Sequence, residues 1–301
     1  MSQKLPEALK ADLPQNNWGK TLAATPVVMT VIATLLAGLA SSEMTRAQYD
    51  RAMAAQLQSK AGDQWNYFQA KKLRAAMQRS TLDLLTATES VRRVPTVVST
   101  LAADDPARSA LEQGAVPSLP PMADHPAPIK AALEALDKQL PESEVLVHVM
   151  KVDDGVLDAT LVAARARVTE FEALIRPMTA AVDKIEATTA FAASNDSEAK
   201  AASRDIMAAR LRFTSSRYEA EAKLNQAIGG LLEIAVRRAN LSGERHHVKS
   251  QRFFYGMLGA QVAVIVATLA VAARQRNFLW GIAAIAGLAA TAFAAYVYIT
   301  H

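Results

Sequence analysis

The amino-acid sequence predicts an all-α fold, in which three transmembrane helices are joined to an elongated extramembrane domain built as a helical bundle or coiled coil. Long uncharged apolar runs near both ends of the chain predict the membrane helices. The middle of the chain is rich in Ala, Glu, Lys, Arg and Leu and poor in glycine, which predicts long helices. Apolar residues recur there about every 3.5 positions, a period typical of supercoiled helices.

The predicted transmembrane helices cover residues 24–42, 253–273 and 278–300. Each run holds roughly 18–23 uncharged residues, about the number that a helix needs to cross a ~30 Å hydrocarbon core. Buried helices of a soluble protein are the alternative, but uncharged runs of this length are rare in soluble folds. Aromatic residues, among them Trp18 and Trp280, stand at the ends of the runs, as rings at a membrane interface do.

The first apolar run has two interpretations. Small residues follow it, as they follow the apolar region of a cleaved signal peptide. The N-terminal tail that precedes the run, residues 1–23, is long for the charged region of a signal peptide. We therefore expect a retained membrane anchor.

The formal net charge of +4 argues against a nucleic-acid partner once its distribution is considered. The excess of positive charge lies beside the apolar runs. The middle of the chain has nearly equal numbers of acidic and basic residues and no basic stripe that would bind phosphates. We expect membrane lipid as a partner, and no nucleic acid.

The orientation in the membrane is predicted from the same flanking charges. The N-terminal tail and the basic hairpin of residues 274–277 must lie on one side if all three runs span the membrane. Short basic loops stay in the cytoplasm, whereas long domains cross largely regardless of charge. This predicts a multi-pass protein of a bacterial inner membrane with residues 43–252 in the periplasm. Four basic residues before the second run favour the opposite orientation: Arg238, Arg245, Lys249 and Arg252. The absence of cysteine fits either side.

The first part of the extramembrane domain is predicted to contain one long and two short helices. The long helix is expected over residues 42–93 and ends at a proline-rich loop of residues 95–128, because a residue before proline disfavours helix. Within the loop we expect a short helix at 108–113. A second short helix is expected at 129–138.

Two further long helices are predicted in the second part. One begins at Pro141, ends at Ser194–Ser197 and contains Pro177, where a kink is expected. The other begins at Glu198 and continues into the second transmembrane run, with a break at Leu241–His247 as the alternative. The apolar series of the Pro141 helix slips by one residue after its sixth member: Val145, Val149, Val152, Val156, Ala159, Ala163, then Phe171, Ile175, Met178, Val182 and Ile185. Such a series predicts the seam of a supercoiled helix pair or bundle.

Three aromatic rings stand together in the stretch "GDQWNYFQAKKLR", residues 62–74, far from any apolar run. Trp65 and Phe68 share one face of the predicted helix, whereas Tyr67 projects from the opposite side. The chain's own helices can cover one face, and a neighbouring copy is the simplest cover for the other. We therefore predict a homo-oligomer, with an ordinary bundle core and an exposed tyrosine as the alternative. The predicted interface consists of Gln64, Trp65, Tyr67, Phe68, Gln69 and Lys71, with Lys71 stacked on the ring of Tyr67.

The same stretch carries a resemblance to a known family. "AGDQWNYFQAKKLR" resembles the pattern A-x-D-Q-W-x-Y-Y/F-Q-A-K of the bacterial membrane-protein family DUF4337, a domain of unknown function. The layout is similar too, with one membrane helix upstream and a closing helical pair around a basic hairpin. The resemblance implies a bacterial inner-membrane protein and supplies no activity.

The sequence contains no recognisable catalytic or metal-binding constellation. None of its 5 histidines has a partner at metal-ligand spacing, and the Gly229-Gly230 pair follows no strand that would make it a phosphate loop. We therefore expect no enzyme activity, no cofactor and no metal. Gly229 and Gly230 are expected at a close approach of two helices.

Small residues recur every four positions in the apolar runs and are expected to pack membrane helices closely. The predicted packing residues are Thr30, Thr34, Gly38, Gly256, Ala260, Gln261, Ala283, Gly287 and Thr291. Gln261 is expected to form interhelical hydrogen bonds. No acid or base interrupts the runs, which argues against an ion-coupled transporter.

The function predicted from these features is structural, namely a scaffold, cage or tether that assembles with copies of itself at the inner membrane. A channel or transport accessory is one alternative, and a membrane signal-relay protein is another. The sequence identifies no protein partner other than a second copy.

Overall fold

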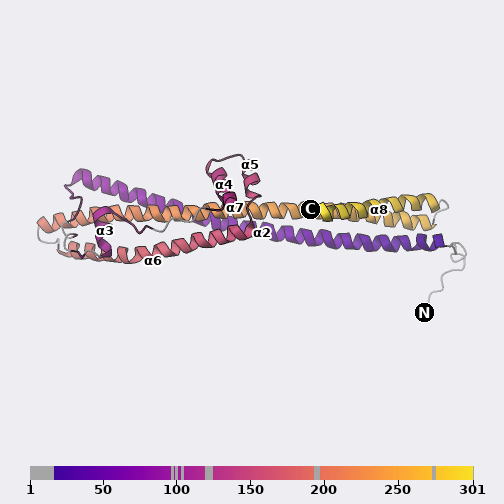
Figure 1. The fold of residues 1–301 in the computed structure, drawn as a ribbon, viewed down its shortest axis with the longest axis horizontal. Helices are drawn as coiled ribbons and strands as arrows, with labels where there is room; N and C mark the ends of the chain where they lie inside the picture. Colours follow the sequence, from indigo (N-terminus) through magenta and orange to yellow (C-terminus); the bar gives the residue numbers. More distant parts are fainter. Residues whose placement is uncertain are drawn as a thin grey trace, which may run out of the picture. The chain divides into compact units, whose positions relative to one another are not determined.

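A computed structural model describes residues 17–95, 98, 101–102, 105–118, 125–192, 197–272 and 276–300. The regular elements in this part of the chain are α2 (Asn17–Thr88), α3 (Pro106–Gln113), α4 (Ala127–Asp137), α5 (Glu142–Val149), α6 (Asp154–Ala192), α7 (Ser197–Ala272) and α8 (Arg276–Thr300). These elements, drawn in Figure 1, confirm the all-α fold. The predicted N-terminal tail, the hairpin and the helix end at Ser194–Ser197 lie largely outside the described residues.

The chain divides into two compact units. The terminal unit comprises residues 1–53 and 239–301, and the central unit comprises residues 54–238. The two long helices α2 and α7 contribute residues to both units.

The terminal unit is a bundle of α2, α7 and α8. Among the described residues, three helices contain apolar stretches long enough to cross a membrane, and these stretches lie within residues 24–88, 197–270 and 278–299. Their packed core consists of Ala33, Leu36, Ala40, Phe253, Ala260, Ala290 and Val297. Four of these seven side chains are alanine, so the helices approach one another closely.

One hydrogen bond places two helix ends of the terminal unit together. The indole Nε1 of Trp280, near the start of α8, donates to Thr25 Oγ1 of α2 over 3.1 Å. The end of α2 next to the N-terminal tail therefore lies beside the end of α8 next to the hairpin. This arrangement is the one required if the tail and the hairpin share one side of a membrane.

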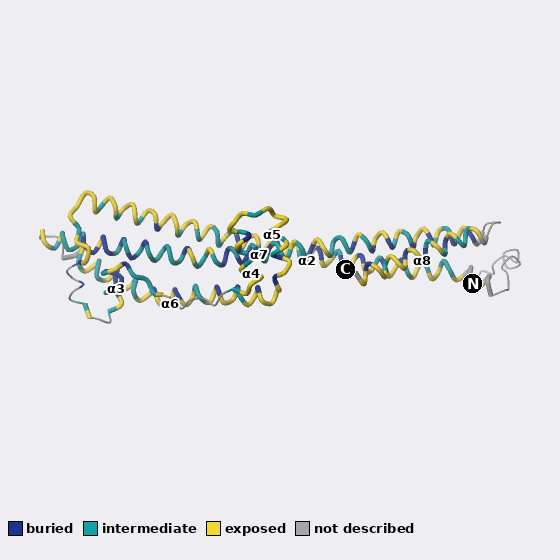
Figure 2. Tube along the Cα trace, turned by 45° about the horizontal axis from the view of Figure 1, so that its top comes forward, coloured by how far each residue is buried: buried dark blue, intermediate teal, exposed yellow. Residues whose placement is uncertain are grey.

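In the central unit α7 lies between α2 and α6, in both views of Figures 1 and 2. Figure 2 shows α7 buried or half-buried here, whereas much of α2 is exposed. One core of buried residues joins α3, α6 and α7 and includes Val98 from the segment before α3. It consists of Val98, Ala107, Ala110, Leu111, Phe171, Ile175, Val182, Ile206, Ala209 and Phe213. The short helices α4 and α5 pack against each other.

The short helix expected in the proline-rich loop is confirmed as α3. Asp105 caps its first turn by accepting a hydrogen bond from the backbone N–H of Ala107 over 2.8 Å, and Pro106 occupies its first position. Gly114 ends it with a φ of 66°, the left-handed conformation that glycine adopts without strain. The helix expected at 129–138 is α4, and α2 ends at Thr88, five residues before the expected end.

The long helix predicted from Pro141 is interrupted, and the prediction of one continuous helix is wrong. α5 ends at Val149 and α6 begins at Asp154. Asp153 caps the new helix, because its Oδ1 accepts a hydrogen bond from the backbone N–H of Val156 over 3.0 Å.

The interruption changes which residues form the apolar seam. The predicted Val156, Ala159 and Ala163 are exposed, and the buried positions are Leu157, Leu161 and Ala164. From Leu157 the buried series continues without a slip through Phe171, Ile175 and Val182. The slip in the predicted seam was therefore the signature of a helix boundary.

Neither Pro177 in α6 nor Gly243 in α7 interrupts its helix. α6 continues through Pro177, and α7 continues through Gly243 and the rest of Leu241–His247. The alternative of a break before the second apolar run is therefore wrong, and α7 is one helix of 76 residues.

Candidate functional site

The ring cluster of α2 is anchored on α7 through its tryptophan. The indole Nε1 of Trp65 donates to Glu233 Oε1 over 2.8 Å, and the ring packs edge-on against Phe68 with 5.5 Å between centroids. A Cβ atom at Gly229 would lie 3.2 Å from Trp65 Cε2, so glycine gives the indole its room on α7. At Gly229, α7 thus lies close to the indole ring of Trp65 rather than to the backbone of another helix.

The ring of Tyr67 points away from Trp65 and Phe68, as its position on the helix predicts. Tyr67 is 58% exposed, whereas Trp65 and Phe68 are half-buried. The predicted stacking of Lys71 on Tyr67 is wrong. Lys71 Nζ instead forms an ion pair with Glu221 and lies 5.3 Å from the ring centroid of Tyr218.

The two predicted interface glutamines lie in different surroundings. Gln69 is exposed. Gln64 faces the chain's own helices and lines a cleft of about 310 Å³ between α2, α6 and α7. The other residues of this cleft are Tyr67, Lys71, Val168, Phe171, Glu172, Glu221, Leu224 and Asn225. We call it the polar cleft. Its position could have been predicted, because Gln64 lies on the same helix face as Ala61, Phe68 and Ala75.

A second face of α2, missed in the sequence, carries exposed aliphatic side chains. Leu73 is 63% exposed, Met77 59% and Leu84 65%. Ala76 and Ser80 are also exposed, and the spacing of the five residues places them on one side of the helix. We call this set the outer stripe. Its spacing of four and seven residues was the signal that sequence analysis passed over.

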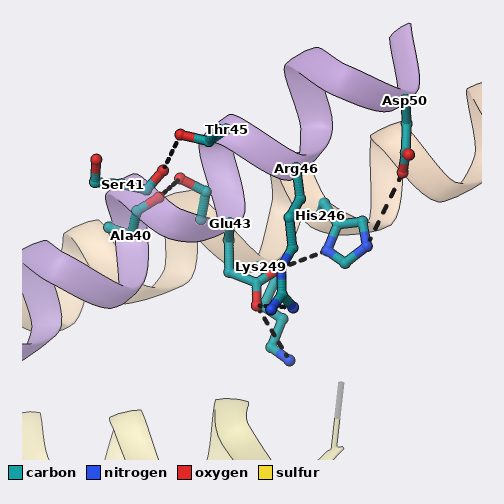
Figure 3. Close-up of polar contacts among 9 residues, drawn as sticks. Ala40, Ser41, Glu43, Thr45, Arg46, Asp50, His246 and Lys249 are labelled. Carbon is teal, nitrogen blue, oxygen red and sulfur yellow. Dashed lines mark hydrogen bonds and ion pairs between the residues drawn. The ribbon is translucent and has the colours of Figure 1, made fainter. Parts of the chain in front are cut away.

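A charge network joins α2 and α7 in the terminal unit, a few residues beyond the first apolar run. Glu43 is 6% exposed, and Figure 3 shows three basic side chains gathered around its carboxylate. His246 Nδ1 lies 2.5 Å from Glu43 Oε2, and Oε1 lies 3.6 Å from Arg46 and 3.7 Å from Lys249. On the other side of the imidazole, Nε2 lies 4.0 Å from Asp50 Oδ2.

The predicted membrane-packing residues separate into two groups. Four face the interior of the terminal bundle: Gly256, Ala260, Ala283 and Gly287. Gly256 faces Leu36 of α2 and Ala290 of α8, and a Cβ atom there would lie 3.5 Å and 3.8 Å from them.

The remaining packing residues are exposed: Thr30, Thr34, Gly38, Gln261 and Thr291. A groove of about 420 Å³ is lined by Thr30, Ala33, Thr34, Ala37, Gln261, Val264 and Ile265. The two threonine hydroxyls donate to backbone carbonyls of their own helix. The Gln261 side chain makes no hydrogen bond with any described residue, so its predicted interhelical bond does not form within one copy.

The start of α6 is tied to α7 by a two-pronged ion pair. Arg238 Nε donates to Asp154 Oδ1 and Arg238 Nη2 lies near Oδ2, each at a distance of 2.8 Å. Arg238 also donates to the Met150 carbonyl. The hydrogen bond from Arg238 lowers the pKa of Asp154 below its usual 3.8, although partial burial opposes the shift.

We expect this pair to stabilise the central unit at neutral pH and to fail in acid. Because the folded-state pKa of Asp154 is depressed, its contribution is present above the unfolded-state value and is lost as the pH falls through the folded value. Asp154→Asn should therefore lower the unfolding temperature at about pH 6 and have less effect at about pH 3. Asp158→Asn, a change at an exposed position of the same helix, is the control and should leave the unfolding temperature unchanged at both pH values. An equal loss at both pH values for Asp154→Asn would contradict the assignment.

The described residues contain no group of three or more His, Cys, Asp or Glu that could hold a metal ion. The expected absence of a cofactor and of enzyme activity stays a prediction. The described residues offer helix contacts, charge pairs and open recesses.

A family match covers the segment that contains these features of α2. Residues 18–113, about a third of the chain, match the family model of a domain of unknown function, DUF4337. This segment belongs to the DUF4337 family. The DUF4337 segment includes the first apolar run, the ring cluster, the outer stripe and α3. No curated protein and no solved structure matches the chain significantly.

Proposed function

We propose that the protein is a self-assembling helical scaffold or tether, anchored in a bacterial inner membrane with its central unit in the periplasm. The observation that carries the proposal is the outer stripe of α2. Its three large aliphatic side chains are exposed within a single copy, and exposed aliphatic residues at heptad-like spacing are typical of a helix that pairs with another helix.

A second copy is the partner that fits this stripe. Every copy inserts α2 into the membrane in the same orientation, so identical residues of two copies lie at the same distance from the membrane. Leu73, Met77 and Leu84 of one copy can then meet the same residues of another, as in a parallel coiled coil. Tyr67, on the adjoining part of the helix, would be covered at the edge of such a contact.

The exposed Gln261 supports assembly inside the membrane as well. A side-chain amide that faces hydrocarbon without a hydrogen bond is costly, and a polar partner from another helix removes that cost. A second copy presents its own Gln261 at the same depth. The groove beside Gln261 is lined by small residues, which favours close helix approach there.

The test is a triple change in the outer stripe, Leu73→Gln, Met77→Gln and Leu84→Gln. Each buried aliphatic side chain contributes about 1.5–3 kcal/mol when it leaves water, so the triple variant should dissociate at least tenfold more readily. Mass photometry in mild detergent reports the masses directly.

The matched control is the double change Val162→Gln and Leu174→Gln, which alters exposed aliphatic residues of α6. It should leave the distribution of masses unchanged. A wild-type chain that is monomeric at micromolar concentration, or a stripe variant with the wild-type distribution, would contradict self-assembly through α2.

A further inference from the structure

The polar cleft contains hydrogen-bonding groups that the chain itself leaves unused. The side-chain Oε1 of Gln64 is buried and has no hydrogen-bond partner. Buried polar atoms are nearly always paired in folded proteins, so an orphan acceptor on a side chain that lines a recess indicates that another molecule supplies the donor when the amide turns toward the recess. Its volume of about 310 Å³ lies at the lower end of the range for small-molecule sites.

The ion pairs of the cleft leave one carboxylate without a partner. Glu221 already has two partners, because both Lys71 and Arg217 form ion pairs with it. Lys71 is in turn occupied by Glu221, which leaves it unavailable to an anion. Glu172, at the rim on α6, forms no ion pair with any described residue. Two acceptors of the cleft, the Gln64 amide oxygen and the Glu172 carboxylate, thus have no partner among the described residues.

The other wall of the cleft is apolar. Val168 and Phe171 of α6 and Leu224 of α7 line it, and the ring of Tyr67 stands at its edge. Phe171 also belongs to the core of the central unit, so this wall is held in place by packing. A ligand that matches both walls carries one positively charged donor group on an apolar or aromatic body.

We propose that the polar cleft binds a small primary amine with an apolar or aromatic body. Its ammonium group donates to Gln64 Oε1 and pairs with the carboxylate of Glu172, and its body packs against Val168, Phe171 and Leu224. An ammonium group has three donors and no acceptor, which suits the two unpaired acceptors of the cleft. This binding is distinct from self-assembly through the outer stripe, because none of Leu73, Met77 and Leu84 lines the cleft.

Binding of 2-phenylethylamine to the full-length chain in nanodiscs tests the proposal by isothermal titration calorimetry, with empty nanodiscs as the reference for partition into lipid. We expect saturable binding with one site per chain. The neutral analogue 2-phenylethanol and the anion phenylacetate should bind at least tenfold more weakly. Nα-acetyl-lysine amide, which presents a protein-like side-chain amine, should also bind more weakly because it lacks the aromatic body.

Matched variants separate the cleft from the rest of the surface. Gln64→Leu and Glu172→Gln should each weaken 2-phenylethylamine binding at least tenfold. Gln69→Leu and Glu170→Gln make the same changes at exposed positions outside the cleft. These two variants should bind 2-phenylethylamine as the wild type does. Absence of saturable binding, equal binding of 2-phenylethanol, tighter binding of the lysine amide, or equal effects of the cleft and control variants would overturn the proposal.

Discussion

Replacing Phe213 with alanine is expected to destabilise the central unit by about 3–5 kcal/mol, the range for removing a fully buried phenylalanine. Phe213 is 1% exposed and lies in the core that joins α3, α6 and α7. Its ring shares that core with Leu111 of α3, so the cavity would form where α3 docks. The unfolding temperature by circular dichroism should fall, and the amides of α3 should lose protection from hydrogen exchange.

A nearby exposed residue provides the control. Met207 lies on the same helix and is 47% exposed, so Met207→Ala should change the free energy of unfolding by about 0.5 kcal/mol or less. Phe213→Leu leaves a smaller cavity, so its loss in the free energy of unfolding should lie between those of Met207→Ala and Phe213→Ala. A loss below about 1 kcal/mol for Phe213→Ala, with α3 still protected, would show that this core does not hold the unit together.

The long helices could be predicted because their signals are local. Uncharged apolar runs and the scarcity of glycine gave the three membrane-length segments and the helical middle. The short α3 was also predictable, since Pro106 and Gly114 mark its two ends. The break before α6 was harder, because Val152 and Val156 have the spacing of a continuous helix. Asp153 was the signal for the new helix, as its side chain caps it.

The side-chain arrangement of the site depends on contacts between distant segments, which one sequence does not disclose. Helix geometry alone correctly separated Tyr67 from Trp65 and Phe68. Helix geometry could not show that Lys71 would form an ion pair with Glu221, 150 residues away, instead of stacking on Tyr67. The same limit applies to Gln64, whose cleft is completed by α6 and α7.

The charge network of the terminal unit was missed for the same reason. Glu43 and His246 are separated by 203 positions, and each taken alone is an ordinary polar residue near an apolar run. The antiparallel pairing of α2 and α7 brings them together. This pairing is also supported by the hydrogen bond from Ser250 Oγ to the Ala40 carbonyl, which is 2.7 Å long.

Replacing Glu43 with alanine should strongly destabilise the terminal unit. Its carboxylate is buried and holds His246 and Lys249 of α7 together with Arg46 of its own helix. Removing one partner of a buried ion pair leaves the others uncompensated. We expect a loss of about 3 kcal/mol, at the low end of the range for such changes because Arg46 still reaches water.

The structure offers two comparisons that isolate this effect. Glu43→Gln keeps a hydrogen-bond acceptor for His246 but removes the charge, so its unfolding temperature should lie between those of the wild type and Glu43→Ala. Glu244→Ala removes an exposed partner of Arg51 in the same unit and should cost about 1 kcal/mol or less. Thermal unfolding of the full-length chain in nanodiscs, followed by hydrogen exchange at the α2–α7 contact, measures all three. If Glu43→Ala and Glu244→Ala had equal effects, Glu43 would contribute no more than a surface ion pair, and burial of its carboxylate would not be what joins α2 to α7.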